Sequence, residues 1–249
     1  CARGRLSAMD STGSSSNPDP SEPAPPRVAA FFDMDKTLIS ENSGSLYMQH
    51  LYGKGEIGLA DLAVGLGEYL RYKIGMLDLE AWVQGMAAPL AGRSESSVVE
   101  EAREWFEECV VEKIYPEALA RVVDHRDAGD LVAIVSGAAS FVIEPLAERL
   151  EIEHVISTRF EVLEGVFTGR VIEPACFEHG KVHWLADFVA RHGIELAKSW
   201  FYTDSVTDLP LLERVGHPVI TNPDPLLYWT AWRRQWPVLF FEPPPAENS

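Results

Sequence analysis

Two aspartates follow a short apolar run near the start of the chain. The run covers residues 28–32, and Asp33 and Asp35 come directly after it. Asp is depleted in strands and is almost never fully buried without a partner. The pair is either a solvated strand end or one part of a site that other segments complete.

Other polar residues also come directly after apolar runs. Ser136 and Gly137 end one run, and Asp204 ends another. Continuous apolar runs of this length are typical of parallel strands that are covered on both faces. The predicted strands lie at residues 28–32, 131–135, 154–157, 200–203 and 217–220.

Helical patterns separate most of these strands. Residues 139–150 and 182–192 each carry one apolar stripe, and residues 159–172 alternate around Glu164 and Gly165 as in a β-hairpin. Strands separated by helices predict an α/β fold with a doubly wound, Rossmann-like parallel sheet. Such a sheet binds ligands at the carboxyl ends of its strands, where Asp33, Ser136 and Asp204 lie.

A long segment without strand signals separates the first two strands. Ser136 follows Asp33 by 136 − 33 = 103 residues, whereas a crossover connection needs only about a dozen. Apolar residues within this segment repeat at helical spacing, which predicts an inserted helical cap. The expected organisation is a flexible tail at 1–27, an α/β catalytic core at 28–41 and 116–249, and a helical cap at 42–115.

Composition excludes several classes of function. The net charge is −17, from 38 acidic and 21 basic residues, which argues against binding to a nucleic-acid backbone. No apolar stretch approaches the roughly 18 residues that cross a bilayer, so membrane insertion is not expected. Cys1, Cys109 and Cys176 lack metal-ligand spacing and favour reduced thiols in a cytoplasmic protein. The chain begins at Cys1, which indicates either a truncated or a processed terminus. The sequence does not specify the oligomeric state.

Four short segments, taken in order, resemble the motifs of the haloacid dehalogenase superfamily. More closely, they resemble its phosphoserine-phosphatase-like subclass IB, which carries a helical cap between the first and second motifs. The resemblance covers roughly residues 28–241. The segments are Asp33-Met-Asp35-Lys-Thr37, Ser136-Gly137-Ala138, Lys181 after His179-Gly180, and Asp204-Ser-Val-Thr-Asp208.

The resemblance implies hydrolysis of a phosphomonoester through an aspartyl-phosphate intermediate. A carboxylate that attacks phosphorus splits one difficult displacement into two easier ones, and Asp33 is assigned this role. Asp35 is expected to protonate the leaving alcohol and then to deprotonate the attacking water. Mg²⁺, which prefers oxygen ligands, is expected to bind Asp33, the Asp35 carbonyl and Asp204.

The same resemblance assigns the remaining residues to phosphate binding and support. Ser136, backbone N–H groups at Gly137, and Lys181 are expected to hold the phosphate oxygens. Thr37 is expected to fix the loop of the first motif. Asp208 is expected to hold a metal-bound water or to steady Lys181.

The substrate is expected to be a small phosphorylated metabolite, such as phosphoserine or histidinol phosphate. Several positions depart from the phosphoserine phosphatase pattern, which weakens the inference of an amino-acid substrate. Asn42 stands where those enzymes carry a Glu, and Thr203 stands where they carry a Gly. Basic residues of the cap can recognise an anionic group or lie on solvated helix faces. The specificity candidates are Asn42, Arg71 and Arg93, with Lys73 as a further basic residue.

Competing interpretations remain open at this point. The chain could be a 2-haloacid dehalogenase, although those relatives lack the second carboxylate at Asp35, or a catalytically silent module that binds a phosphorylated ligand. Locally, Asp208 could be only a helix N-cap, Lys181 a solvated helix residue, and Ser136 with Gly137 a turn. The tryptophans near the end are predicted to serve packing: Trp229, Trp232 and Trp236.

Overall fold

The computed structural model describes residues 26–73 and 76–245. Cys1 and almost all of the predicted tail lie outside these residues. The strands in the described part are β1 (Ala29–Phe32), β2 (Leu131–Ala139), β3 (His154–Leu163), β4 (Val166–Ile172), β5 (Trp200–Thr203), β6 (His217–Thr221) and β7 (Val238–Leu239).

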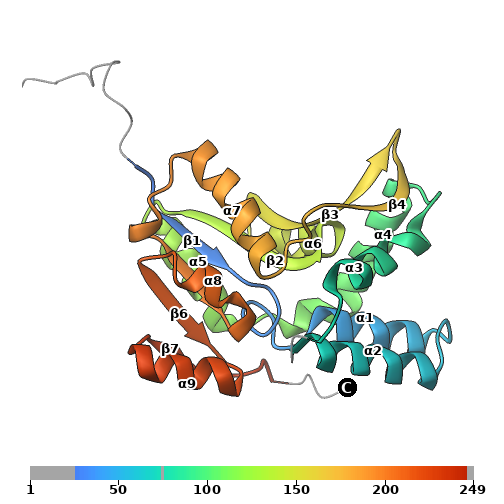
Figure 1. Ribbon diagram of the computed structural model, residues 1–249, viewed down its shortest axis with the longest axis horizontal. Helices are drawn as coiled ribbons and strands as arrows, with labels where there is room; N and C mark the ends of the chain where they lie inside the picture. Colours follow the sequence, from blue (N-terminus) through green and yellow to red (C-terminus); the bar gives the residue numbers. More distant parts are fainter. Residues whose placement is uncertain (1–25, 74–75, 246–249) are drawn as a thin grey trace, which may run out of the picture.

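Within the described residues, seven strands form one sheet in the order β4-β3-β2-β1-β5-β6-β7. All neighbouring strands are parallel except β3 and β4, which form an antiparallel hairpin. The first strand lies near the middle, so the chain winds outward in both directions from β1 (Figure 1). This confirms the predicted doubly wound, Rossmann-like sheet.

Side-chain alternation along β1 divides the hydrophobic core between the two faces of the sheet. Ala30 and Phe32 pack in one cluster, which includes residues of α5 and α6. Ala29 and Phe31 pack in the other cluster, which includes residues of α7, α8 and α9. The covering helices are α5 (Pro116–Asp127), α6 (Ser140–Arg149), α7 (His179–His192), α8 (Leu209–Leu212) and α9 (Pro225–Arg234).

A helical insertion connects β1 to β2, as predicted. In Figure 1 its helices and the β3–β4 hairpin gather on the right of the view. It contains α1 (Ser43–Gly53), α2 (Leu59–Lys73), α3 (Leu79–Ala87), the 3₁₀ turn Ala88–Leu90, α4 (Glu95–Trp105), the π-helical turn Phe106–Val110 and the 3₁₀ turn Val111–Lys113. Further 3₁₀ turns at Leu196–Lys198 and Val206–Asp208 belong to the second half of the chain. The exact boundary between cap and core stays a prediction.

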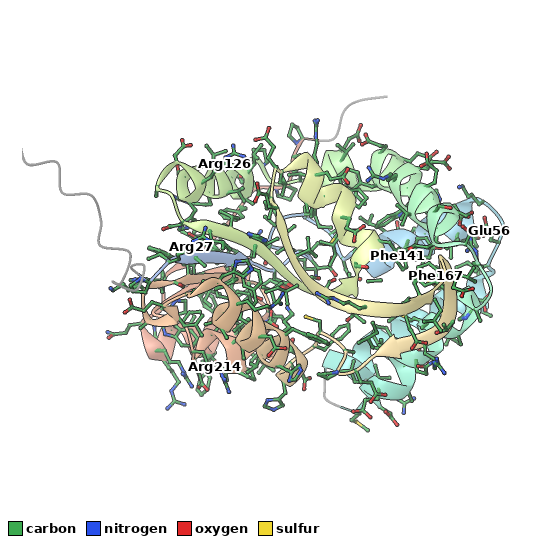
Figure 2. All side chains as sticks on the ribbon, turned by 90° about the horizontal axis from the view of Figure 1, so that it is seen from above. Arg27, Glu56, Arg126, Phe141, Phe167 and Arg214 are labelled. Carbon is green, nitrogen blue, oxygen red and sulfur yellow. The ribbon has the colours of Figure 1, made fainter. Side chains whose placement is uncertain are left out.

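The hairpin is hydrogen-bonded to the insertion. Backbone bonds join Gly92 to Phe167 at 2.9 Å and Phe167 to Arg93 at 3.0 Å. The Gln84 side chain of α3 donates to the Gly169 carbonyl at 2.6 Å. Phe141 of α6 also packs edge-to-face against Phe167, with ring centroids 5.8 Å apart (Figure 2). The hairpin thus links the sheet to the inserted helices.

Several element boundaries differ from the prediction. The predicted strand at 154–157 and the first arm of the hairpin form one continuous strand, β3. Strand β2 runs past Ser136 to Ala139, because its pairing with β3 shifts register between Val135 and Ala139 and then resumes. The two-residue strand β7 was not predicted, since its two apolar residues are too few to give a periodic signal.

The packing role predicted for the last tryptophans is wrong for two of them. Trp229 and Trp232 are 56% and 71% exposed, because the inner face of α9 is formed by Leu227 and Ala231. Trp236 does pack against the sheet core. No helix in the described part of the chain is both long and apolar enough to cross a membrane.

Candidate active site

The carboxyl ends of β1 and β5 lie side by side. The two strands are parallel and in register, with Phe32 opposite Tyr202. Pairing continues one residue further, because the Asp33 amide donates to the Tyr202 carbonyl at 2.9 Å. Neighbouring strands are about 4.8 Å apart. Asp33 and Asp204 therefore leave the sheet next to each other, as the sequence predicted.

The side chain of Lys181 lies between two carboxylates. Its Nζ is 2.8 Å from Asp33 Oδ1 and 2.9 Å from Asp208 Oδ2. All three side chains are buried, with residue exposures of 5%, 7% and 2% for Lys181, Asp33 and Asp208. A buried charge requires such pairing, since an unpaired one is very costly. The interpretation of Lys181 as a solvated helix residue is therefore wrong.

Asp208 supports Lys181 and does not cap a helix. Its side chain makes no capping bond to α8, which begins at the next residue. Its Oδ2 instead accepts a 2.6 Å hydrogen bond from the Thr203 hydroxyl, which in turn accepts from the Ser205 amide at 3.2 Å. Sequence reasoning noted Thr203 only as a departure from a family pattern and missed this contact.

The position of Lys181 depends on a tight entry into α7. The Gly180 amide donates to the Phe177 carbonyl at 2.6 Å, and the same carbonyl accepts from the Lys181 amide at 3.4 Å. A Cβ at Gly180 would lie only 1.8 Å from the Ala175 carbonyl oxygen. Only glycine fits there without a backbone shift, so the residue before Lys181 fixes where its side chain enters the site.

Asp35 is held at the N-terminus of α1. Its Oδ1 accepts from the Ser43 amide at 2.9 Å, and its Oδ2 accepts from Asn42 Nδ2 at 2.8 Å. The other end of the Asn42 amide caps α1 by accepting from the Ser45 amide at 2.9 Å. Asn42, predicted as a substrate contact, thus positions Asp35, and a direct contact with substrate stays a prediction.

Burial perturbs the ionisable groups of this cluster. It raises the pKa of Asp33 to about 7, although the Lys181 ammonium opposes the shift. It also raises the pKa of Asp35, although the Ser43 amide opposes the shift. Burial would lower the pKa of Lys181, but Asp208 and Asp33 outweigh it and raise that pKa well above its ordinary value. Lys181 therefore stays protonated, and the two nearby acids have a reduced tendency to ionise.

Ser136 and Gly137 lie in the irregular part of β2 and not in a turn after it. The Ser136 hydroxyl oxygen accepts from the Ala138 amide at 3.3 Å, and the Gly137 carbonyl accepts from the Thr158 hydroxyl at 2.7 Å. A Cβ at Gly137 would lie 2.3 Å from the ring of Phe177. Phe177 therefore covers this part of the strand, a contact that no sequence pattern indicated.

The Thr37 side chain connects the loop after β1 to the end of β6, and the predicted roles of Thr37 in fixing this loop and in phosphate binding stay predictions. Its buried hydroxyl lies 3.1 Å from the hydroxyl of Thr221 at the end of β6. Nearby, the Asp204 carbonyl accepts from the Asp224 amide at 2.8 Å, and the Asp224 carboxylate accepts from the Val206 amide at 2.9 Å. The loops that follow three parallel strands are thus hydrogen-bonded to one another around Asp204.

The donor set fits a hard divalent cation. Carboxylate and carbonyl oxygens are the ligands that Mg²⁺ prefers, usually with only one or two carboxylates and several waters. The Lys181 ammonium already bonds two carboxylates, Asp33 and Asp208, so these three groups together carry an excess of negative charge when both acids are ionised. Within residues 26–73 and 76–245, no three His, Cys, Asp or Glu side chains converge as a metal cluster. The predicted set needs only two carboxylates and one backbone carbonyl.

In the described part of the chain, neither Arg71 nor Arg93 is shown in contact with the aspartates or Lys181. Arg71 is exposed on α2. The Arg93 guanidinium forms an ion pair with Glu101 of α4. The side chain of Lys73 lies outside the part of the chain that the structure describes. Roles for Arg71 and Arg93 in substrate recognition stay predictions.

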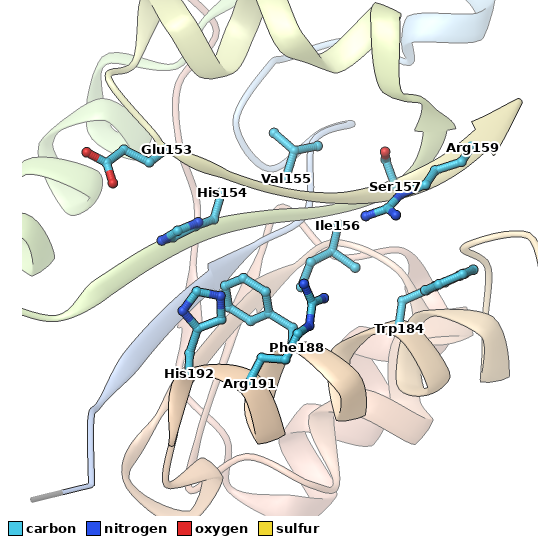
Figure 3. A pocket seen from close by; sticks show the side chains of 10 residues that line it. All are labelled: Glu153, His154, Val155, Ile156, Ser157, Arg159, Trp184, Phe188, Arg191 and His192. Atoms are coloured by element: carbon cyan, nitrogen blue, oxygen red, sulfur yellow. The ribbon is translucent and has the colours of Figure 1, made fainter. Parts of the chain in front are cut away.

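A separate cavity of about 200 Å³ lies away from this cluster. Figure 3 shows that β3 and α7 line it, with His154 facing His192 and Phe188. None of the predicted site residues lines this cavity. The candidate active site is therefore defined by the hydrogen-bonded aspartates and Lys181.

Comparisons with known proteins identify the family of this chain. The family model described as haloacid dehalogenase-like hydrolase matches residues 30–213. A histidinol-phosphatase of Neisseria meningitidis serogroup C (strain 8013) is 35% identical over 218 residues, which cover 86% of this chain and 98% of the relative. The chain therefore belongs to the haloacid dehalogenase-like hydrolase family.

Solved structures give the same fold. A protein of unknown function from Bordetella pertussis Tohama I matches with a TM-score of 0.78 and 33% identity, covering 86% of this chain and 99% of that one. A phosphoserine phosphatase carrying an analogue of a phospho-aspartyl intermediate matches with a TM-score of 0.63 and 17% identity, covering 88% and 95%. The second likeness establishes the fold alone.

Proposed function

We propose that the protein is a magnesium-dependent phosphomonoesterase that uses Asp33 as its nucleophile. The observation that carries this proposal is the buried arrangement of Asp33, Lys181 and Asp208 at the ends of parallel strands. Lys181 bonds one oxygen of Asp33 and so orients the carboxylate toward a bound phosphoryl group. The phosphatase names of relatives, among them the Neisseria protein, support the same reaction class.

In the first step, Asp33 forms an O–P bond while the bond from phosphorus to the ester oxygen breaks. Asp35 gives its proton to the departing alkoxide, so the alcohol leaves neutral. The raised pKa of Asp35 suits this role, because a general acid must still hold its proton near the working pH. Ser136 and Lys181 bind phosphate oxygens whose charge changes during the transfer.

In the second step, water attacks phosphorus and the bond between phosphorus and Asp33 breaks. Asp35, now a carboxylate, accepts the proton of the water, and inorganic phosphate leaves. Asn42 and the Ser43 amide hold Asp35 in one orientation for both proton transfers.

Mg²⁺, held by Asp33, the Asp35 carbonyl and Asp204, would neutralise charge that a dianionic phosphate brings near these carboxylates. The Lys181 ammonium already bonds the carboxylates of Asp33 and Asp208, so it cannot by itself balance the charge of a bound phosphate. Asp224 and Val206 brace the loop that carries Asp204, which keeps that ligand in place.

The other two interpretations are less well supported. Asp35, held by two hydrogen bonds, has no role in halide displacement, where no leaving alcohol needs a proton. A silent module that binds a phosphorylated anion would not require a buried Asp33 carboxylate in contact with the Lys181 ammonium. We place the enzyme in the cytoplasm and expect it to act on a small phosphorylated metabolite. Cys109 and Cys176 are free thiols, and this fits a reducing compartment, where disulfides are rare.

The test is phosphate release from a set of phosphomonoesters. We expect turnover that stops with EDTA, returns with Mg²⁺ and falls by about 10³-fold or more in Asp33→Asn. Circular dichroism checks that this variant remains folded. Release of chloride from 2-chloropropionate without metal would instead establish the dehalogenase, and ester binding without turnover in Mg²⁺ would establish the silent module.

A further inference from the structure

Three side chains from different segments form a cluster at the junction of the insertion and the core. Trp82 of α3 donates from its indole Nε1 to Glu68 Oε2 of α2 at 2.8 Å. The Trp82 ring also meets the ring of Phe177 edge-to-face, with centroids 6.1 Å apart and planes at 70°. Phe177 belongs to the loop between β4 and α7, so the cluster joins two cap helices to the core.

The core end of this cluster touches the candidate active site. The Phe177 ring lies against Gly137, where a Cβ would come within 2.3 Å of it. The Phe177 carbonyl accepts from the amide of Lys181, whose ammonium bonds Asp33. Phe177 therefore contacts both the proposed phosphate-binding residues and Trp82.

Glu68, Trp82 and Phe177 are each only partly buried, so each keeps some exposed surface. Aromatic faces attract cations through the ring quadrupole, and a carboxylate accepts hydrogen bonds from charged N–H groups. Together they can hold a flat ring that carries a protonated nitrogen. A carboxylate on the substrate would instead be repelled by Glu68.

We propose that Glu68, Trp82 and Phe177 form a specificity subsite for the alcohol part of the substrate. The subsite takes a phosphomonoester whose alcohol carries a protonated nitrogen on or beside a flat ring, such as an imidazole. This inference rests on the proposed phosphomonoesterase function and extends it to the substrate class. It predicts that L-histidinol phosphate is preferred over phosphoserine, which carries a carboxylate in addition to its ammonium group.

The experiment compares kcat/KM for three esters: L-histidinol phosphate, phosphoserine and glycerol 1-phosphate. Glycerol 1-phosphate has neither ring nor charge on its alcohol and serves as the reference. In the wild-type protein we expect the highest kcat/KM for L-histidinol phosphate. Glu68→Gln can still accept a hydrogen bond from the Trp82 indole but has lost the negative charge. In this variant, the kcat/KM for L-histidinol phosphate divided by that for glycerol 1-phosphate should fall about tenfold.

Two further variants separate recognition from folding. Phe177→Leu removes the ring beside Gly137 and should lower the same ratio through KM. Glu80→Gln removes an exposed acid from the same helix, α3, without touching the cluster, and should leave the ratio unchanged. Melting temperatures show whether each variant remains folded.

Each result decides between the hypotheses. The inference is overturned if the wild type does not prefer L-histidinol phosphate, or if Glu68→Gln changes the ratio no more than Glu80→Gln does. A folded wild-type protein that hydrolyses none of the three esters in Mg²⁺ would count against the proposed function itself. Turnover of all three with no preference would leave the phosphatase standing and remove only the subsite.

Discussion

The core and the cap differ in how firmly packing holds the residues that would meet the substrate. In the core, Asp33, Lys181 and Asp208 are almost fully buried and bonded to one another. In the cap, Glu68 and Trp82 keep part of their surface exposed. Reaction chemistry needs catalytic groups in a fixed geometry. Side chains that recognise the substrate must instead keep surface that the substrate can contact. The comparison suggests that the two tasks are divided between the two regions.

The cap itself is not uniform. Trp105 of α4 is 2% exposed and belongs to the same hydrophobic cluster as Phe32 of β1. On α2, by contrast, Leu59 and Leu66 are 70% and 61% exposed. The last helix of the insertion is therefore part of the core packing. The contrast predicts that substitutions at the catalytic cluster have large effects and that surface changes in α4 have small ones.

After the loss of the nucleophile in Asp33→Asn, the largest effect is expected from Lys181→Met. The change leaves Asp33 and Asp208 buried without their ammonium partner, which we expect to cost about 3 kcal/mol of stability. The loss of a donor to the transferring phosphoryl group should also lower kcat/KM by about 10²–10³-fold. Chemical denaturation and phosphate-release kinetics measure the two effects. Lys198→Met, at a lysine that is 62% exposed in its ion pair with Glu195, is the control and should change neither.

A smaller but still large effect is expected from Gly180→Ala. The new Cβ would collide with the Ala175 carbonyl oxygen, so the entry into α7 must shift and Lys181 must move with it. We expect a loss of about 1–3 kcal/mol in stability together with reduced kcat. Gly85→Ala is the matched control, because it lies in α3 with open space around its Cβ and should be neutral or slightly stabilising. Equal behaviour of the two variants would contradict this account of the α7 entry.

The pH dependence of the metal-free protein should reflect Asp33. Its pKa is raised from 3.8 to about 7, so between these values the folded state holds a proton that the unfolded state has released. Stability in EDTA should therefore fall as pH rises from about 4 to 7. Asp33→Asn has no such proton, so its melting temperature should fall less over this range. Parallel curves for the two proteins would show that Asp33 titrates normally.

The smallest effect is expected from Arg103→Gln in α4. Arg103 pairs with Glu148 of α6 on the surface, where solvent screens the attraction. We expect an unchanged melting temperature and an unchanged kcat/KM. A marked loss of activity would mean that the contact between α4 and α6 controls the site. It would contradict the claim that reaction chemistry depends on the core alone.

Much of the site could be predicted because its signals are local. Asp33 and Asp204 directly follow apolar runs, and parallel strands bring their carboxyl ends to one edge. The order of motifs singled out Lys181 and Asp208, whose contact the structure now shows. The fold followed from the same alternation of strands and helices.

What could not be predicted depends on how the chain folds back on itself, both locally and between distant segments. The Thr203 hydroxyl reaches Asp208, five residues later, because the chain turns after β5. Phe177 covers Gly137 because the loop before α7 lies against β2. The exposed face of α9, with Trp229 and Trp232, was misjudged because apolar character was taken to mean burial. The path of the folded chain, and not the hydrophobic pattern, decides each of these cases.

The most direct test of the central claim is to trap the phosphorylated enzyme. A reaction with a ³²P-labelled phosphomonoester in Mg²⁺ is quenched in acid within one turnover, and the labelled peptide is identified by mass spectrometry. We predict label on Asp33 in the wild-type protein and none in Asp33→Asn. Label on another residue, or rapid turnover with no labelled protein at any time, would contradict covalent catalysis by Asp33.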